Sequence, residues 1–86
     1  PVEGTMARIL LADDDAATRD LVKRALATDG HAVTSTQDGT EALDAITAGP
    51  ADFDLLISDV QMPGLDGIGL AENALAAAPG LRIILM

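Results

Sequence analysis

Two groups of aspartates follow short apolar runs in this 86-residue chain. Asp13 and Asp14 come directly after the apolar residues 9–12, and Asp59 comes directly after the run that ends at Ser58. Clustered carboxylates repel one another and are costly to desolvate, so such a grouping needs a compensating partner. Hard divalent cations prefer oxygen ligands of this kind. The two groups therefore predict a divalent-cation site with a carboxylate to spare, if the fold brings them together.

Strand and helix patterns alternate along the segments that must position these aspartates. Four short apolar runs predict β-strands, over residues 8–12, 32–35, 55–58 and 81–86. Three helix patterns lie between them, ending near residues 28, 48 and 78. This β-α-β-α-β-α-β order predicts an α/β fold in which a doubly wound parallel sheet carries helices on both faces.

Local signals place the helices more closely. Five residues at three- and four-residue spacing predict the apolar face of the first helix: Thr18, Leu21, Val22, Ala25 and Leu26. Gly30 suits the left-handed position past the end of that helix. Asp38 and Glu41 form a capping-box pattern for the second helix, and the third begins near Asp66.

The predicted topology brings the aspartates together. In a parallel α/β sheet the carboxyl ends of all strands lie on one edge, where ligands bind near the point of strand-order reversal. We expect the first and third strands to be neighbours at that point. Asp13, Asp14 and Asp59 would then converge on one pocket.

Composition narrows the classes of protein that fit. The net charge of −9, with five basic residues, argues against nucleic-acid binding through this segment. The chain has no cysteine, so a disulfide framework and a thiolate metal site are both excluded, and a cytoplasmic location fits. No apolar run approaches the roughly 20 residues of a membrane span. These features predict one small cytoplasmic domain that does not contact membranes.

The stretch ILLADDDAATRDLV, followed later by DLLISDVQMPGLDGIGL, resembles the receiver domain of two-component response regulators. The resemblance runs from about residue 7 to residue 86, and it implies a flavodoxin-like sheet with strand order 2-1-3-4. Residues 1–6 are expected to be a leader or an expression remnant. The matching features are an acidic pair after the first strand, an aspartate after the third, and Met-Pro and Asp-Gly at fixed offsets beyond it.

The resemblance implies a role for each site residue. Asp59 is expected to be the phosphoacceptor, taking a phosphoryl group from a sensor histidine kinase or a phosphotransfer protein. Asp13 and Asp14 are expected to hold Mg²⁺ (or Mn²⁺) together with Asp59, Asp14 directly and Asp13 through water. Gln61 is expected to add its backbone carbonyl to the metal. The domain would be a signalling module of a phosphorelay rather than an enzyme, changing its contacts with an output partner that the sequence does not identify.

Neighbouring residues have simpler interpretations. Asp15 is expected to cap the first helix without contacting the metal. Asp54 and Asp66 are expected to be turn and cap residues, and Met62 to pack within its loop. His31, at the start of the second strand, is expected to have a surface or edge role rather than one in phosphotransfer.

The chain also departs from the receiver pattern. It ends at Met86, about one residue before the Ser or Thr that receivers carry after strand four, and without their Lys after strand five. The fifth strand and last two helices are absent too, so strand four is expected to be an open edge. We favour a longer chain that was cut or left partly unseen. The alternatives are a dimer through the open sheet edge and a natural, degenerate receiver.

Two other functions compete with the phosphorelay receiver. One is an unphosphorylated protein-interaction fragment, which the missing elements favour. The other is a metal-dependent phosphohydrolase of the Asp-x-Asp class, because Asp13 and Asp15 have that spacing. Such enzymes prefer Thr or Val at the position of Ala17, and their mechanism has no role for Asp59.

Overall fold

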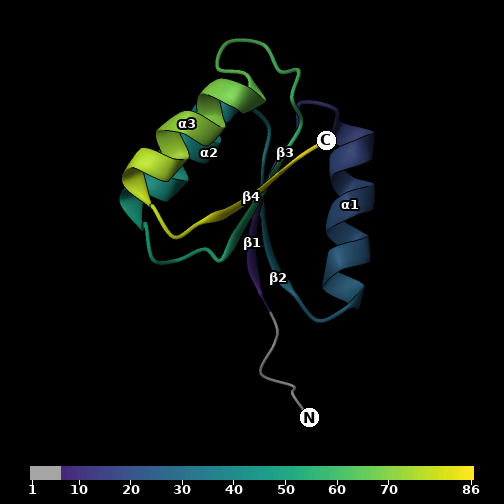
Figure 1. Ribbon diagram of the computed structural model, residues 1–86. Coiled ribbons are helices and arrows are strands. Elements are labelled where there is room, and N and C mark those ends of the chain that lie inside the picture. Colours follow the sequence, from purple (N-terminus) through teal and green to yellow (C-terminus); the bar gives the residue numbers. More distant parts are fainter. Residues whose placement is uncertain (1–6) are drawn as a thin grey trace.

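A four-stranded parallel sheet in the order β2-β1-β3-β4 forms the centre of the molecule in the computed structural model, which describes residues 7–86 (Figure 1). β1 (Arg8–Ala12) lies between β2 (Ala32–Thr36) and β3 (Leu55–Ser58), and β4 (Arg82–Leu85) pairs with β3. The predicted fold class and strand order are confirmed. The order reverses between β1 and β3, whose carboxyl ends therefore lie side by side.

Helices cover both faces of the sheet, as the alternating pattern predicts. α1 (Ala16–Thr28) lies on one face, and α2 (Gly39–Ala48) and α3 (Gly67–Ala77) lie together on the other (Figure 1). The predicted boundaries differ from the observed ones by a residue or two, because element ends are set by local hydrogen bonds. Gly30 follows α1 with a φ of 91°, the left-handed conformation that its sequence position predicts.

Two hydrophobic cores hold these layers together. The larger lies between the sheet and the α2–α3 pair, and its buried members are Leu10, Ala12, Ala42, Ile46, Leu56, Met62, Leu70, Ala74, Ala78 and Leu81. The smaller lies under α1, where Ile9, Leu11 and Ile57 are buried. Successive side chains of a strand point to opposite faces, so Leu10 and Leu11 supply different cores. Met62, which was expected to pack within its loop, is a buried member of the larger core.

The predicted apolar face of α1 is too wide. Val22 and Leu26 pack against the smaller core, but Leu21 is 68% exposed, and Thr18 and Ala25 are exposed as well. Helical spacing identifies a stripe of apolar residues but not the width of the surface that the stripe meets. Within residues 7–86, α1 is the one helix on its face of the sheet, so only its inner edge is covered.

β4 lies at the edge of the sheet, as expected. Within the described residues it pairs with β3 alone, and the exposed fractions of Ile84, Leu85 and Met86 are 50%, 40% and 46%. A dimer through this edge stays a prediction. In the same part of the chain, no helix has the length and apolar character that crossing a membrane requires.

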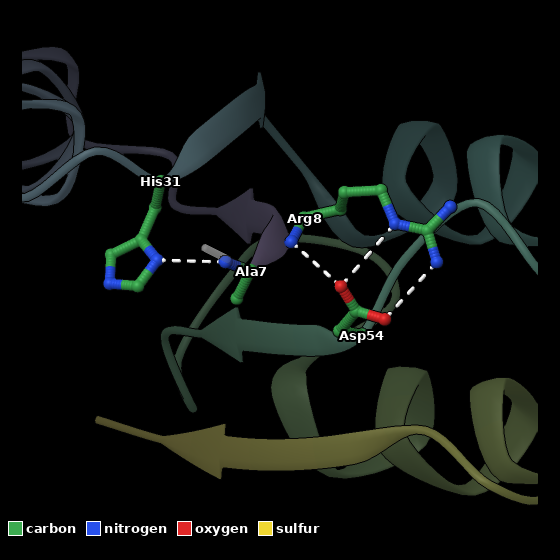
Figure 2. A network of polar contacts seen from close by, with 4 residues as sticks. All are labelled: Ala7, Arg8, His31 and Asp54. Carbon is green, nitrogen blue, oxygen red and sulfur yellow. Dashed lines mark hydrogen bonds and ion pairs between the residues drawn. The ribbon is translucent and has the colours of Figure 1, made fainter. Parts of the chain in front are cut away.

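Polar contacts join three strands at the amino end of the sheet (Figure 2). The Asp54 carboxylate accepts hydrogen bonds from the Arg8 backbone N–H at 2.9 Å and from its guanidinium Nε and Nη2 at 3.3 and 3.1 Å. The Ala7 N–H donates to His31 Nδ1 at 3.0 Å. Asp54, predicted as a turn residue, therefore also ties β3 to β1, while His31 has the edge role that was predicted.

Candidate functional site

Backbone hydrogen bonds fix the ends of the two central strands at the opposite, carboxyl edge of the sheet. Ala12 of β1 pairs with Ser58 of β3, so Asp13 and Asp59 are the next residues of two strands in register. The Asp59 N–H donates to the Ala12 carbonyl at 2.9 Å, and the Asp13 N–H donates to the Thr36 carbonyl of β2 at 3.2 Å. The backbone at both aspartates is thus an extension of the sheet ladder.

The three predicted aspartates form one cluster. Asp13, Asp14 and Asp59 each offer a carboxylate oxygen, and these oxygens lie within 4.8 Å of one another. Asp13 is buried, with 1% of its surface exposed, whereas Asp59 is half-buried and Asp14 is exposed. The predicted convergence is confirmed, and the cluster is closed on the side of β1 and open on the side of Asp14.

Local hydrogen bonds orient the carboxylates. Asp13 Oδ1 accepts the Asp15 N–H at 2.9 Å, and Asp59 Oδ1 accepts the Gln61 N–H at 3.2 Å. Within residues 7–86 the ion pairs are Arg8–Asp54 and Asp20–Arg24, and neither involves the cluster. Backbone amides therefore hold these side chains in place without neutralising them by a neighbouring cation.

Arg19 is a neighbour of the site that the sequence motifs do not predict. Arg19 Nη1 donates to the Asp13 backbone carbonyl at 2.8 Å and so fastens α1 to the loop that carries the acidic pair. No local pattern indicates this contact, because the helix dipole disfavours a cation near a helix start by too little to mark a specific partner.

Asp15 stands apart from the cluster, as predicted. Its Oδ2 accepts the Thr18 N–H at 2.9 Å and also the Thr18 hydroxyl, which makes it the N-cap of α1. These hydrogen bonds to Thr18 lower the pKa of the Asp15 carboxyl. Its ionised form is therefore stabilised by its own helix. Asp66 is likewise the N-cap of α3, where Oδ1 accepts the Gly69 N–H at 2.8 Å.

An open hollow of about 620 Å³ adjoins the cluster on the side of Asp14. Its lining comes from the loop after β3, from the first residue before α3 and from Asp14 itself: Asp14, Val60, Gln61, Met62, Pro63 and Asp66. A small group could reach Asp14 from this side, next to the loop that begins at Asp59. Gln61 lines the hollow, and its role as a backbone-carbonyl ligand of the metal stays a prediction.

The chemistry of this donor set fits a hard divalent cation. Three carboxylates supply oxygen ligands, and Mg²⁺ is characteristically held by one or two carboxylates with water and phosphate oxygens completing its shell. The buried Asp13 gives the set a further reason to bind a cation, because an ionised carboxylate away from water is costly without a counter-charge.

The sequence matches a family model described as the response regulator receiver domain, over residues 9–86. The chain belongs to this family. It is 38% identical over 79 residues to the response regulator MprA of Mycolicibacterium vanbaalenii, covering 92% of this chain and 33% of that protein. The chain thus spans about a third of the length of this curated relative.

Solved receiver structures have the same fold. The response regulator TrrA of Thermotoga maritima, solved in complex with Mg²⁺-BeF, is 35% identical, with a TM-score of 0.86 over 93% of this chain and 68% of that one. A complex of the histidine kinase ThkA with TrrA matches with a TM-score of 0.84, at 35% identity, over 93% of this chain and 67% of that one. The receiver fold and the family predicted from the acidic motifs are confirmed.

Family membership also bears on the competing functions. Receiver domains are generally signalling modules rather than enzymes. The Asp-x-Asp hydrolase alternative needs the Asp15 carboxylate to take part in catalysis. That carboxylate instead accepts a hydrogen bond from the Thr18 N–H as the N-cap of α1. Neither the family nor the geometry favours that alternative.

Proposed function

We propose that this receiver domain accepts a phosphoryl group on the carboxylate of Asp59, with a divalent cation held by Asp13, Asp14 and Asp59. One observation carries the proposal: three carboxylates from the ends of two adjacent strands lie within 4.8 Å of one another without an ion-pair partner in the described part of the chain. A cluster of this kind is suited to a ligand that brings positive charge.

The residues of the cluster have unequal tasks in this proposal. Asp59 is the nucleophile, because it is half-buried at the start of the loop that lines the hollow and its Oδ1 is fixed by the Gln61 N–H. Asp13 and Asp14 hold the cation, and the carbonyl of Gln61 completes its protein ligands. The bound cation supplies charge that offsets the repulsion between an anionic carboxylate and an anionic phosphoryl group.

The reaction forms one bond and breaks one. A carboxylate oxygen of Asp59 bonds to phosphorus, while the bond from phosphorus to the donor atom breaks and the donor keeps the electron pair. The donor is the phosphohistidine of a sensor kinase or phosphotransfer protein, and a small acyl phosphate can replace it. The product is an acyl phosphate, whose added charge can bias the contacts of the domain with an output partner.

The kinase-bound structure of TrrA supports this class of partner, since TrrA is a relative of similar fold. The Mg²⁺-BeF complex of TrrA supports the choice of cation in the same way. The proposal implies a cytoplasmic location and no turnover beyond the phosphorylation and dephosphorylation of the domain itself.

Intact mass measurement tests the proposal. The protein is incubated with Mg²⁺ and acetyl phosphate, and we expect a gain of one phosphoryl group in the wild type and none in Asp59→Asn. Asp54→Asn is the matched control, because it removes a carboxylate five residues away and should keep the adduct. An adduct that persists in Asp59→Asn, or a wild type that gains none, would contradict the proposal.

A further inference from the structure

The two helices on one side of the sheet begin in the same way. Asp38 caps α2 and is followed by the buried Gly39, and Asp66 caps α3 and is followed by the buried Gly67. An N-cap aspartate explains the first residue of each pair. It does not explain the glycine, which is a poor helix former in a position open to most residues.

Gly67 contacts the backbone that carries the proposed phosphoacceptor. A Cβ atom at position 67 would lie 2.8 Å from the Cα of Val60 and closer still to the Asp59 carbonyl oxygen. The Gly67 N–H also donates to the Val60 carbonyl at 2.9 Å. The first residue of α3 therefore lies directly on the Asp59–Val60 peptide, at a distance that only a residue without a side chain allows.

Gly39 makes the corresponding contact at the other end of the same loop. A Cβ atom at position 39 would lie 3.1 Å from the Leu65 carbonyl carbon and closer still to its oxygen. Position 39 lies 26 residues before Leu65 in the sequence, so this contact exists only in the folded protein. The first residue of α2 thus supports the end of the loop that leads into the Asp66 cap.

We propose that Gly39 and Gly67 are positioning residues that clamp the loop of residues 59–66 from both ends. This loop carries Asp59 and Gln61 and lines the hollow beside Asp14. The inference rests on the proposed function, because it concerns the alignment of Asp59 and Gln61 with the acidic pair. Both glycines lie against backbone atoms, which cannot rotate away as a side chain can, so a side chain at either position must shift the loop relative to the helix.

Gly69 offers a matched control in the same helix. A Cβ atom there would meet the Cδ1 of Leu65 at 2.8 Å, which is the flexible end of a side chain rather than backbone. Gly69→Ala therefore makes the same chemical change as Gly67→Ala, also in the first turn of α3. It differs in leaving the Asp59–Val60 peptide in place.

The experiment compares Gly39→Ala, Gly67→Ala and Gly69→Ala with the wild type by titration with Mg²⁺ and by urea unfolding. For Gly67→Ala we expect the Mg²⁺ affinity of the folded protein to fall roughly tenfold, the lower end of what loss of a supporting contact around a metal costs. Gly39→Ala should lose affinity by a smaller factor, and Gly69→Ala should match the wild type. A purely structural role would lower the unfolding midpoint and leave the affinity of the folded fraction unchanged.

The outcomes separate this inference from the proposed function. Wild-type protein that binds Mg²⁺, with Gly67→Ala and Gly69→Ala binding it equally well, would overturn the clamp and leave the proposed function standing. Wild-type protein that neither binds Mg²⁺ nor gains a phosphoryl group would overturn the proposed function and the clamp with it.

If Gly67→Ala does not fold, hydrogen exchange of the wild type decides. We expect Mg²⁺ to slow exchange of the Gly67 amide, which bonds to Val60, more than that of the Gly69 amide, which bonds to the Asp66 side chain. Equal slowing at both amides would overturn the clamp.

Discussion

The two ends of the central strands treat their carboxylates in opposite ways. At the amino end, Asp54 accepts three hydrogen bonds from Arg8, and this contact lowers the pKa of the Asp54 carboxyl and raises that of the Arg8 guanidinium (Figure 2). At the carboxyl end, Asp13, Asp14 and Asp59 face one another, and no salt bridge within residues 7–86 includes them.

The difference separates one carboxylate whose charge is paired within the fold from three whose charges have no ion-pair partner among residues 7–86. Asp54 is paired within the chain, so its ionised form stabilises the joining of β1 to β3. Backbone amides hold the Asp13 and Asp59 carboxylates, and one oxygen of each of the three aspartates lies within 4.8 Å of the others, so their charges repel. Proteins retain such an arrangement where an added cation or reacting group uses it.

Removing a carboxylate from each end should affect Mg²⁺ binding very differently, and this is the largest effect we expect. Asp14→Asn removes a proposed ligand and should weaken Mg²⁺ affinity by more than about tenfold. Asp54→Asn should leave the affinity unchanged, because Asp54 lies at the opposite end of the strands. Titration of both variants with Mg²⁺ measures this, and equal losses would show that the two ends do not differ as we describe.

The stability of the metal-free protein should change in opposite directions at the two ends. Asp59→Asn relieves repulsion while its amide oxygen can still accept the Gln61 N–H, so the free energy of unfolding should rise, by up to about 1 kcal/mol. Asp54→Asn should lower it, because the charge that pairs with Arg8 is lost. Urea unfolding without Mg²⁺ measures both, and a loss of stability in Asp59→Asn would contradict the account of the cluster.

The smallest expected effect is in the pH dependence of Asp54. Because the folded pKa of this carboxyl is below its usual value, its contribution to stability is complete above the unfolded pKa of about 3.9 and is lost as the pH falls through the folded pKa. The stability difference between wild type and Asp54→Asn should therefore shrink from pH 7 toward pH 3. Asp15 also has a lowered pKa, but it is present in both proteins and cancels. A difference that stays constant over this range would argue against the ion pair.

Much of this architecture could be predicted from local patterns. Alternating apolar runs and helix caps such as Asp38 predict the order of elements. Asp13 and Asp59 come together because they follow the ends of neighbouring parallel strands. The motifs around Asp59 then identified the family. These inferences need only the neighbouring residues and the general rules of α/β sheets.

The remaining features depend on contacts between distant segments. Arg8 and Asp54 are 46 residues apart and meet only because β1 and β3 pair in one register. The approach of Gly39 to Leu65 depends on how α2 packs beside α3, which no local pattern specifies. The exposure of Leu21 depends on what else covers the face on which α1 lies.

The most direct test is to locate the phosphoryl group in wild-type protein treated with Mg²⁺ and acetyl phosphate. Borohydride reduction converts an aspartyl phosphate to homoserine, which peptide mass spectrometry can assign to one residue. We expect homoserine at position 59 and unmodified aspartate at positions 13, 14 and 54. Homoserine at any of those three positions, or none at position 59, would contradict it.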